Sequence, residues 1–203
     1  MSGPGEELEV KFYLRHAQQL QSRLEALGAR LEQPRTLEIN LRFDTPNLDL
    51  LRSGRLLRLR QDTAARITFK GPGREEGGAR LRQELEFTAG DFATARAVFE
   101  ALGYSVYMLY EKQRATYALG AVLVTLDEMP YGDFAEIEGP DASSIQQAAA
   151  DLGLDWSRRI LDSYTVLFEV ARKNLGFTFR DLSFANFTGL SVPAEALAVE
   201  PAD

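Results

Sequence analysis

Cysteine is absent from this chain of 203 residues, and histidine occurs once, at His16. The lack of thiols excludes disulfides, thiolate metal ligands and cysteine nucleophiles, and it is typical of proteins from a reducing compartment. A histidine-rich zinc site or a Ser/His/Asp triad would have to be built on His16 alone. We expect His16 to be an exposed or capping residue at the start of a helix.

Long apolar runs are missing as well. No window approaches the roughly 18 uninterrupted apolar residues of a membrane span, and no basic region followed by an apolar stretch opens the chain. We therefore expect a cytoplasmic protein that does not bind membranes. The 23 basic and 30 acidic residues give a net charge of −7, which argues against a nucleic-acid partner but is compatible with a local basic pocket.

Glu-x-Glu pairs occur three times, each followed by a helix-like stretch that ends in Leu-Gly. The pairs are Glu7 and Glu9, Glu84 and Glu86, and Glu136 and Glu138; the endings are Leu27-Gly28, Leu102-Gly103 and Leu152-Gly153. Successive side chains of an extended strand point to opposite faces, so each pair places two carboxylates on one face. Each copy therefore predicts a strand followed by a helix.

Strand patterns dominate the rest of the chain. Alternation of apolar and polar residues predicts strands at 6–14, 37–44, 55–61, 65–70, 80–88, 104–110, 112–119, 121–127 and 134–138. Helical spacing predicts helices near 16–27, 90–102 and 142–152, with a fourth near 157–173. So many short strands, separated by turns such as Gly71-Pro72-Gly73 and Gly77-Gly78, favour an α+β fold with an antiparallel barrel or strongly curved sheet. We expect one domain over residues 1–188 and a surface tail over 189–203.

Charged residues share one face of strand after strand. The sets are Arg58 with Arg60, Thr68 with Lys70, Arg82 with Glu84 and Glu86, Lys112 with Arg114, and Thr125 with Asp127. On an open sheet these faces would meet water; in a closed barrel with helices outside, they would line a lumen. Carboxylates bind Mg²⁺ or Mn²⁺, and Arg and Lys bind phosphate oxygens, so such a lumen is suited to a polyphosphate.

Several segments in order resemble the CYTH family, also called triphosphate tunnel metalloenzymes. They are Glu7-Leu8-Glu9-Val10-Lys11, Phe43-Asp44-Thr45-Pro46, Leu57-Arg58-Leu59-Arg60, Thr68-Phe69-Lys70-Gly71, Arg82-x-Glu84-x-Glu86, Lys112-x-Arg114, Asp127, Gly132 to Glu138, and Ser163-Tyr164. The resemblance covers about residues 6–168. It implies an eight-stranded antiparallel barrel that forms a tunnel for a triphosphate.

The resemblance also implies roles for individual residues. One or two Mg²⁺ or Mn²⁺ ions would be held by Glu7, Glu9, Asp127, Glu136 and Glu138, with Glu84 contributing to a second metal. The phosphates would be gripped by Arg58, Arg60, Lys70 and Arg114, helped by Arg82 and Lys112. Lys11 would bind the phosphate nearest the reaction or act on the attacking water. Some members pair this lysine with a tyrosine where this chain has Arg42, so a thiamine triphosphatase is disfavoured and the general base is unnamed.

Three functions follow from the residues and the resemblance. The first is metal-dependent hydrolysis of inorganic triphosphate or a short polyphosphate. The second is an adenylate cyclase of class IV, which converts ATP to cyclic AMP and pyrophosphate; the third is a non-catalytic phosphate-binding module. In each case the partner is a small-molecule triphosphate or nucleotide, and a homodimer is expected from the relatives. We also predict that Glu7 and Glu9 lie within metal-bridging reach of Glu136 and Glu138.

Overall fold

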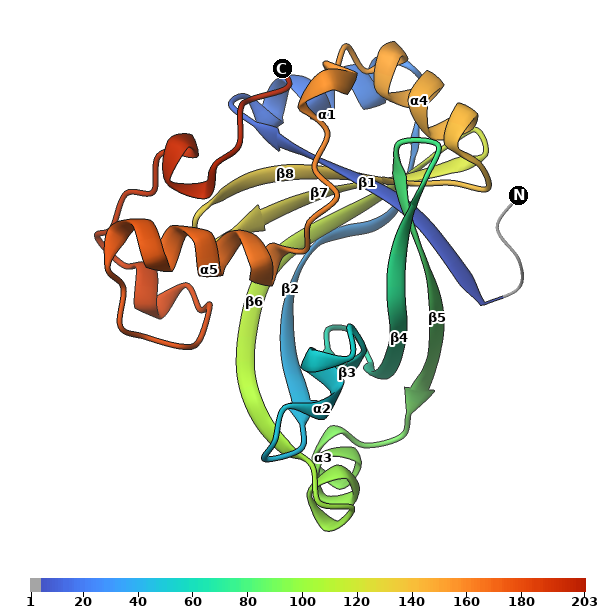
Figure 1. Cartoon of the computed structure of the whole chain (residues 1–203). Helices are drawn as coiled ribbons and strands as arrows, with labels where there is room; N and C mark the ends of the chain where they lie inside the picture. The colour runs from blue at the N-terminus through green and yellow to red at the C-terminus, as the bar shows by residue number, and fades with distance from the viewer. Residues whose placement is uncertain (1–4) are drawn as a thin grey trace.

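Eight antiparallel strands close into a barrel in the computed structural model, which describes residues 5–203 (Figure 1). Around the ring the order is β1-β5-β4-β3-β2-β6-β7-β8, and β8 pairs with β1 to close it. The strands are β1 (Glu6–Leu14), β2 (Arg30–Asp44), β3 (Leu56–Gln61), β4 (Ala65–Glu76), β5 (Ala79–Ala89), β6 (Ser105–Leu119), β7 (Val122–Met129) and β8 (Gly132–Glu138). The predicted α+β barrel is confirmed. Residues 1–4, where the expected domain begins, lie outside the described part.

The strands differ from the prediction in extent. The segments expected at 104–110 and 112–119 form one strand, β6, because Tyr110, Lys112 and Arg114 keep the same alternation through the charged stretch. Gly71-Pro72-Gly73 is not a turn: it lies within β4 at a register shift between Lys70 and Gly73. A bulge accepts proline, which has no N–H for the ladder. The β4–β5 turn lies at Gly77 and Gly78 instead, both with positive φ.

Within residues 5–203, five α-helices accompany the barrel, and the three that follow the Glu-x-Glu strands are confirmed. They are α1 (Ala17–Ala26), α3 (Phe92–Ala101) and α4 (Ala142–Asp151); the others are α2 (Asp49–Arg52) and α5 (Tyr164–Leu175). The fourth predicted helix begins later than expected, because the Ser163 side chain caps its N-terminus by accepting from the Val166 N–H. The short α2 was not predicted: the Asp44 carboxylate induces it by accepting from the N–H groups of Leu50 and Leu51.

The Leu-Gly endings stop the helices in the same way. Gly28 has a φ of +74°, and the N–H of Ala29 donates to the carbonyl of Leu24 at 2.9 Å. Gly103 and Gly153 end α3 and α4 with the same pattern. A left-handed glycine with this six-residue hydrogen bond satisfies carbonyls that the helix end leaves free. The repeat is therefore a local stop signal. His16, before α1, is exposed and makes no side-chain cap.

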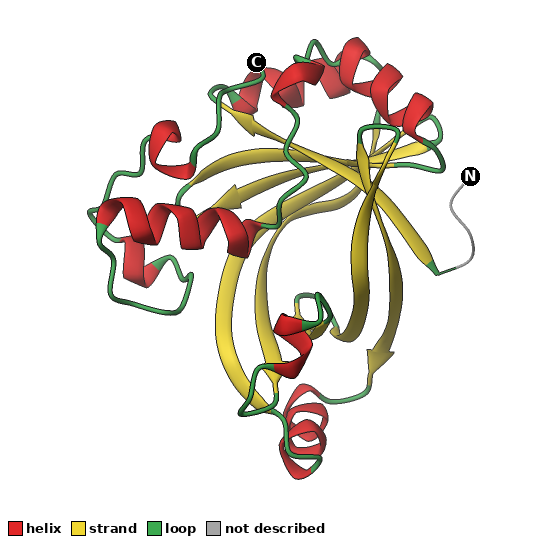
Figure 2. Cartoon of the chain, viewed as in Figure 1, coloured by secondary structure: helices red, strands yellow, loops and turns green. Residues whose placement is uncertain are grey.

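The helices lie outside the barrel (Figure 2). Apolar side chains of the strands and helices pack together between them. Leu24 of α1 and Ile145 of α4 pack with Val10 and Ile137, all with no exposed surface. Phe168 of α5 packs with Phe134, and Phe43 with Phe99 of α3. The charged strand faces therefore point inward, which excludes the open sheet with its polar face in water. No helix within residues 5–203 has the length and apolar character needed to cross a membrane.

Residues 189–203, which were expected to form a surface tail, are anchored to the barrel at a few positions. Leu197 and Ala202 are buried, and the Ala202 N–H donates to the Tyr13 carbonyl at 3.0 Å. The Asp203 carboxylate accepts from the N–H groups of Arg15 and His16, each at 2.7 Å. These hydrogen bonds hold Ala202 and Asp203 against the segment that joins β1 to α1.

Candidate functional site

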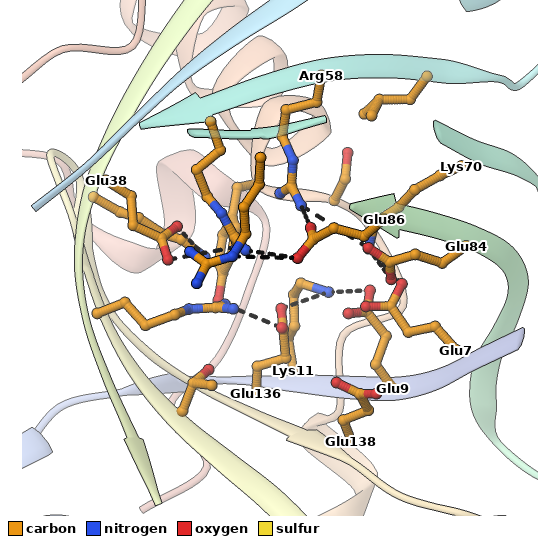
Figure 3. Close-up of a pocket in the computed structure, with 18 of the residues that line it drawn as sticks. Glu7, Glu9, Lys11, Glu38, Arg58, Lys70, Glu84, Glu86, Glu136 and Glu138 are labelled. Carbon is orange, nitrogen blue, oxygen red and sulfur yellow. Dashed lines mark hydrogen bonds and ion pairs between the residues drawn. The ribbon is translucent and has the colours of Figure 1, made fainter. Parts of the chain in front are cut away.

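The barrel encloses a cavity of about 450 Å³ whose wall is mostly charged (Figure 3). Ten Arg or Lys side chains and eight Asp or Glu side chains line it. The lining therefore carries a formal excess of two positive charges, although the whole chain has a net charge of −7. Such a cavity attracts polyanions.

Twelve of the thirteen predicted site residues line this cavity: Glu7, Glu9, Lys11, Arg58, Arg60, Lys70, Arg82, Glu84, Lys112, Arg114, Glu136 and Glu138. They come from the inward positions of β1, β3, β4, β5, β6 and β8, as the alternation predicts. Asp127 is the exception. Its side chain is fully buried beneath the wall and accepts from Arg114, Lys112 and Tyr164.

Carboxylates gather on one side of the cavity, around the junction of β1 with β8 and β5. Figure 3 shows Glu7, Glu9, Glu84 and Glu138 together there, with Lys11 beside them and Glu38 on the opposite side. Glu9 pairs in register with Glu138, and Lys11 with Glu136. The Lys11 ammonium lies 2.5 Å from Glu9 and 3.1 Å from Glu136. Lys70 pairs with Glu7 and lies 3.0 Å from Glu84.

Burial and crowding shift the pKa values at this acidic side. Burial raises the pKa of Glu9, as does the neighbouring Glu136 charge, and burial raises that of Glu7. Partial burial, followed by the charges of Glu7 and Glu136, raises the pKa of Glu138 to about 7. Burial would also raise the pKa of Glu136, but Lys11 and Arg114 hold it well below its usual range.

The Lys11 ammonium stays protonated. Burial opposes its charge, but Glu136 and Glu9 more than offset that effect and raise its pKa. Lys11 is therefore a hydrogen-bond donor and a positive charge near neutral pH. In this state Lys11 cannot accept a proton from water as a general base. Of the two roles expected of it, binding the phosphate nearest the reaction is the one that a protonated lysine can perform.

The acidic side has the donor chemistry for a metal, although its side chains are paired with lysines. Carboxylate oxygens are the ligands that Mg²⁺ and Mn²⁺ prefer. As the side chains stand, no group of three Asp or Glu residues in the described chain is arranged around a metal position. Binding would require Lys11 and Lys70 to release Glu9 and Glu7. The carboxylates fit the expected metal by their chemistry alone, and the predicted bridging geometry remains a prediction.

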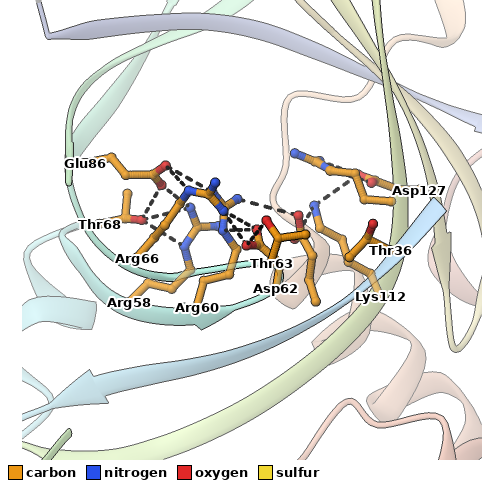
Figure 4. Close-up of polar contacts among 12 residues, drawn as sticks. Thr36, Arg58, Arg60, Asp62, Thr63, Arg66, Thr68, Glu86, Lys112 and Asp127 are labelled. Carbon is orange, nitrogen blue, oxygen red and sulfur yellow. Dashed lines mark hydrogen bonds and ion pairs between the residues drawn. The ribbon is translucent and has the colours of Figure 1, made fainter. Parts of the chain in front are cut away.

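Arginine and lysine side chains interleave with carboxylates in another part of the cavity (Figure 4). Arg58 lies 3.3 Å and Arg60 3.0 Å from the carboxylate of Glu86. Arg60 and Lys112 also face Glu38, at 3.6 and 3.5 Å. Burial would raise the pKa of Glu38, but Lys112 and Arg114 lower it to about 2. These guanidinium and ammonium groups form an array suited to phosphate oxygens.

Behind this array, one buried network holds two cations in place. Asp127 accepts from Arg114 Nε at 2.6 Å and from the Tyr164 hydroxyl at 2.7 Å, with Lys112 3.3 Å away. Tyr164 is the first residue of α5, and its ring lies 5.4 Å from the Lys112 ammonium. Asp127 thus positions Arg114 and Lys112. Its expected role as a metal ligand stays a prediction.

Several lining residues were not predicted from the sequence. Glu38, Asp62, Arg66, Arg80 and Tyr110 all line the cavity. Alternation could have found Glu38, because it shares an inward face of β2 with Asn40 and Arg42. Asp62 follows β3 in a loop and accepts from the Ala64 N–H, so no strand period marks it.

The chain is similar to known proteins in sequence and in fold. The family model described as CYTH domain matches residues 5–161. No curated protein matches the chain. Among solved structures, a candidate adenylate cyclase from Vibrio parahaemolyticus has a TM-score of 0.72 at 21% identity, covering 80% of this chain and 97% of the other.

Two further structures are similar. The PH1012 protein of Pyrococcus horikoshii has a TM-score of 0.65 at 27% identity, covering 78% of this chain and 96% of the other. A candidate adenylyl cyclase from Hippeastrum, described as having a dominant triphosphatase activity, has a TM-score of 0.59 at 19% identity, covering 80% and 95%. The likenesses to the Vibrio and Hippeastrum proteins concern the fold.

Proposed function

The chain belongs to the CYTH domain family, and on that basis we propose that it hydrolyses a triphosphate in a metal-dependent reaction inside the barrel. The observation that carries the proposal is the cavity lining, in which a positive excess accompanies a cluster of carboxylates on one side. A pure metal site needs only the carboxylates, and a pure anion site needs only the cations. A metal-bound polyphosphate needs both.

Arginine and lysine side chains would bind the phosphate chain. Arg58, Arg60, Lys70, Lys112 and Arg114 are buried or half-buried, and each is paired with a carboxylate. A bound triphosphate would take over part of this pairing, since charge-assisted hydrogen bonds to phosphate replace those to carboxylate. The ion pairs hold these cations at the cavity wall before the substrate arrives, and the phosphates would exchange with the carboxylates as partners.

Glu7, Glu9, Glu136 and Glu138 would hold Mg²⁺ or Mn²⁺, with Glu84 beside Glu7. A bound divalent ion supplies charge neutralisation for the phosphates and lowers the pKa of a bound water. Lys11 lies between Glu9 and Glu136 and stays protonated. It would donate to a phosphoryl oxygen and stabilise the charge that develops there.

The test is to incubate the protein with tripolyphosphate or ATP and Mg²⁺ or Mn²⁺, and to identify the products. We expect orthophosphate and pyrophosphate from tripolyphosphate, and no reaction in a chelator. Glu9→Gln should lower the activity and the Mn²⁺ affinity by at least about tenfold, since a ligand is lost. Calorimetry with Mn²⁺ measures the affinity separately from turnover. Glu100→Gln, on the exposed face of α3, is the matched control.

The alternatives predict other products. A cyclase would convert ATP to cyclic AMP and pyrophosphate, and a binding module would release nothing while still binding the anion. Cyclic AMP as the main product would replace the hydrolase proposal, and so would tight binding without turnover. Glu9→Gln with unchanged Mn²⁺ affinity would contradict the metal assignment.

A further inference from the structure

Tyr110 of β6 lines the cavity and has no part in the proposed function so far. It is 7% exposed and faces inward with Lys112 and Arg114 of the same strand. Within residues 5–203 two tyrosines line the cavity, and the other, Tyr164, donates its hydroxyl hydrogen to Asp127 at 2.7 Å. Tyr110 is therefore the lining tyrosine whose hydroxyl is not bound to a carboxylate.

The Tyr110 hydroxyl has a hydrogen that is free to bind an acceptor. Its oxygen accepts a hydrogen bond from Arg58 Nη1 at 3.2 Å. A guanidinium only donates, so this contact uses a lone pair of the hydroxyl and leaves its hydrogen unused. In the described part of the chain no acceptor takes that hydrogen. Arg58 is itself held by Thr68 at 3.0 Å, so it fixes the hydroxyl at the cavity wall.

Positive charge beside the hydroxyl strengthens it as a donor. Burial would raise the pKa of Tyr110, but Arg58 of β3 and Lys112 of β6 lower it, and Glu38 of β2 only partly opposes them. Tyr131, in the β7–β8 turn, also interacts with Tyr110, but it is neutral because burial raises its own pKa. A more acidic hydroxyl donates more strongly, most of all to a charged oxygen.

Tyr110 also lies beside polar groups whose hydrogen-bonding capacity is unused. In register it is opposite Asn40 of β2, which is in turn opposite Arg60 of β3. Asn40 has no exposed surface, and neither its Oδ1 nor its Nδ2 has a hydrogen-bond partner; the Nε of Arg60 has none either. Buried polar groups are normally paired. The unused donors of this row favour a ligand that brings acceptor oxygens to this part of the wall.

We propose that Tyr110 is a further catalytic residue, whose hydroxyl, oriented by Arg58, donates a hydrogen bond to a phosphate oxygen of the bound triphosphate. The inference rests on the proposed function. The hydroxyl adds a neutral donor beside Arg58 and Lys112, and it stabilises negative charge on that oxygen without transferring its proton.

The first experiment compares Tyr110→Phe with Tyr117→Phe. Tyr117 is on the outer face of β6 and is 5% exposed, so this control makes the same change on the same strand away from the cavity. We expect Tyr110→Phe to lower kcat/KM for tripolyphosphate at least about tenfold, because one donor to the charged oxygen is lost. Tyr117→Phe should stay within about twofold of the wild-type protein. An unchanged value for Tyr110→Phe, or an equal loss in Tyr117→Phe, overturns the proposal.

An alkaline titration followed by tyrosinate absorbance tests the contact without turnover, because no divalent metal is added. The usual pKa of a tyrosine is about 10. We expect an ionisation below that value in the wild-type protein and in Tyr117→Phe, and we expect Tyr110→Phe to lack it. Tripolyphosphate should move this ionisation upward by at least about one pH unit, since a bound anion keeps the proton on the hydroxyl that donates to it.

The titration separates this inference from the proposed function. If tripolyphosphate is not hydrolysed with Mg²⁺ or Mn²⁺, the hydrolase proposal fails, and the upward shift would still support the contact with a bound polyphosphate. The absence of a shift overturns the inference even where hydrolysis is confirmed. Loss of activity in Tyr110→Phe without the shift would mean that Tyr110 only orients Arg58, which also contradicts the contact.

Discussion

Individual side chains in this barrel are held by buried charge pairs, and Asp127 is the most constrained of them. Its carboxylate has no exposed surface and is shared by Arg114, Lys112 and Tyr164. A surface pair of the same kind, such as Glu169 with Arg172, has both partners in water. The two pairs therefore differ in what their loss would cost.

Asp127→Asn should destabilise the protein by up to roughly 3–5 kcal/mol, because it removes the buried carboxylate that Arg114 and Lys112 share and leaves each of them with one partner, Glu136 and Glu38 respectively. Glu169→Gln, which removes the exposed carboxylate, should cost less than about 1 kcal/mol. The free energies of unfolding from urea denaturation measure both changes. Equal costs would mean that Asp127 does not hold the cations as described.

Glu38 gives a prediction about acid stability. Its pKa of about 2 in the folded protein lies below that of an ordinary glutamate, mainly because of Lys112 and Arg114, which overcome its burial. Its stabilisation is therefore complete above the unfolded pKa and is lost as pH falls toward 2. Glu38→Gln should lower the free energy of unfolding by about 3 kcal/mol at pH 7 and by much less near pH 2. Unfolding measured from pH 7 to pH 2 tests this, and parallel curves for the two proteins would refute it.

At the scale of elements, the β4–β5 hairpin touches α4 through its turn. Gly77 has a φ of +61°, and a Cβ there would lie 2.5 Å from the Cβ of Ala142. Gly120, in the β6–β7 turn, has nearly the same φ of +59° with no atom within 4 Å of that position. The two glycines share a backbone requirement and differ in their surroundings.

Gly120→Ala should cost about 1 kcal/mol, which is the penalty for a side chain in the left-handed region. Gly77→Ala should cost distinctly more, because the added methyl group also forces the hairpin away from α4. Thermal unfolding of both variants measures the difference. If the two costs are the same, the turn does not pack on α4.

Individual elements show how much of the fold and of the candidate site could be predicted from the sequence. Alternation on β1, β5 and β8 placed Glu9, Glu84 and Glu136 correctly, because a strand's period assigns each residue to a face without knowledge of its neighbours. It failed for Asp127, which is on an inward face but lies beneath Arg114. The hydrogen bond from Arg42 of β2 to Thr165 of α5 was also missed, because these residues are more than a hundred positions apart and no local pattern encodes such a contact.

At the scale of the whole molecule, the last residues fasten the barrel to α1. Deleting residues 199–203 would remove the buried Ala202 and the Asp203 carboxylate that accepts from Arg15 and His16. We expect the deletion to lower the free energy of unfolding by about 2 kcal/mol or more, from lost hydrogen bonds to a charged group. Asp203→Ala should reproduce only part of that loss. Urea denaturation of the two variants checks the order, and a deletion without effect would show that this segment does not fasten the barrel.

The closure of the ring also fixes when the first strand can complete its pairing during synthesis. The strand that carries Glu7, Glu9 and Lys11 is made first, but one of its two partners is β8, near residue 135. Contacts this distant in sequence form slowly, and domains emerge from the ribosome N-terminus first. During synthesis the first strand must therefore wait, unpaired on that edge, until β8 has been made. The acidic side of the cavity is assembled only at that step, so a nascent chain does not have the complete charged cavity before the barrel is closed.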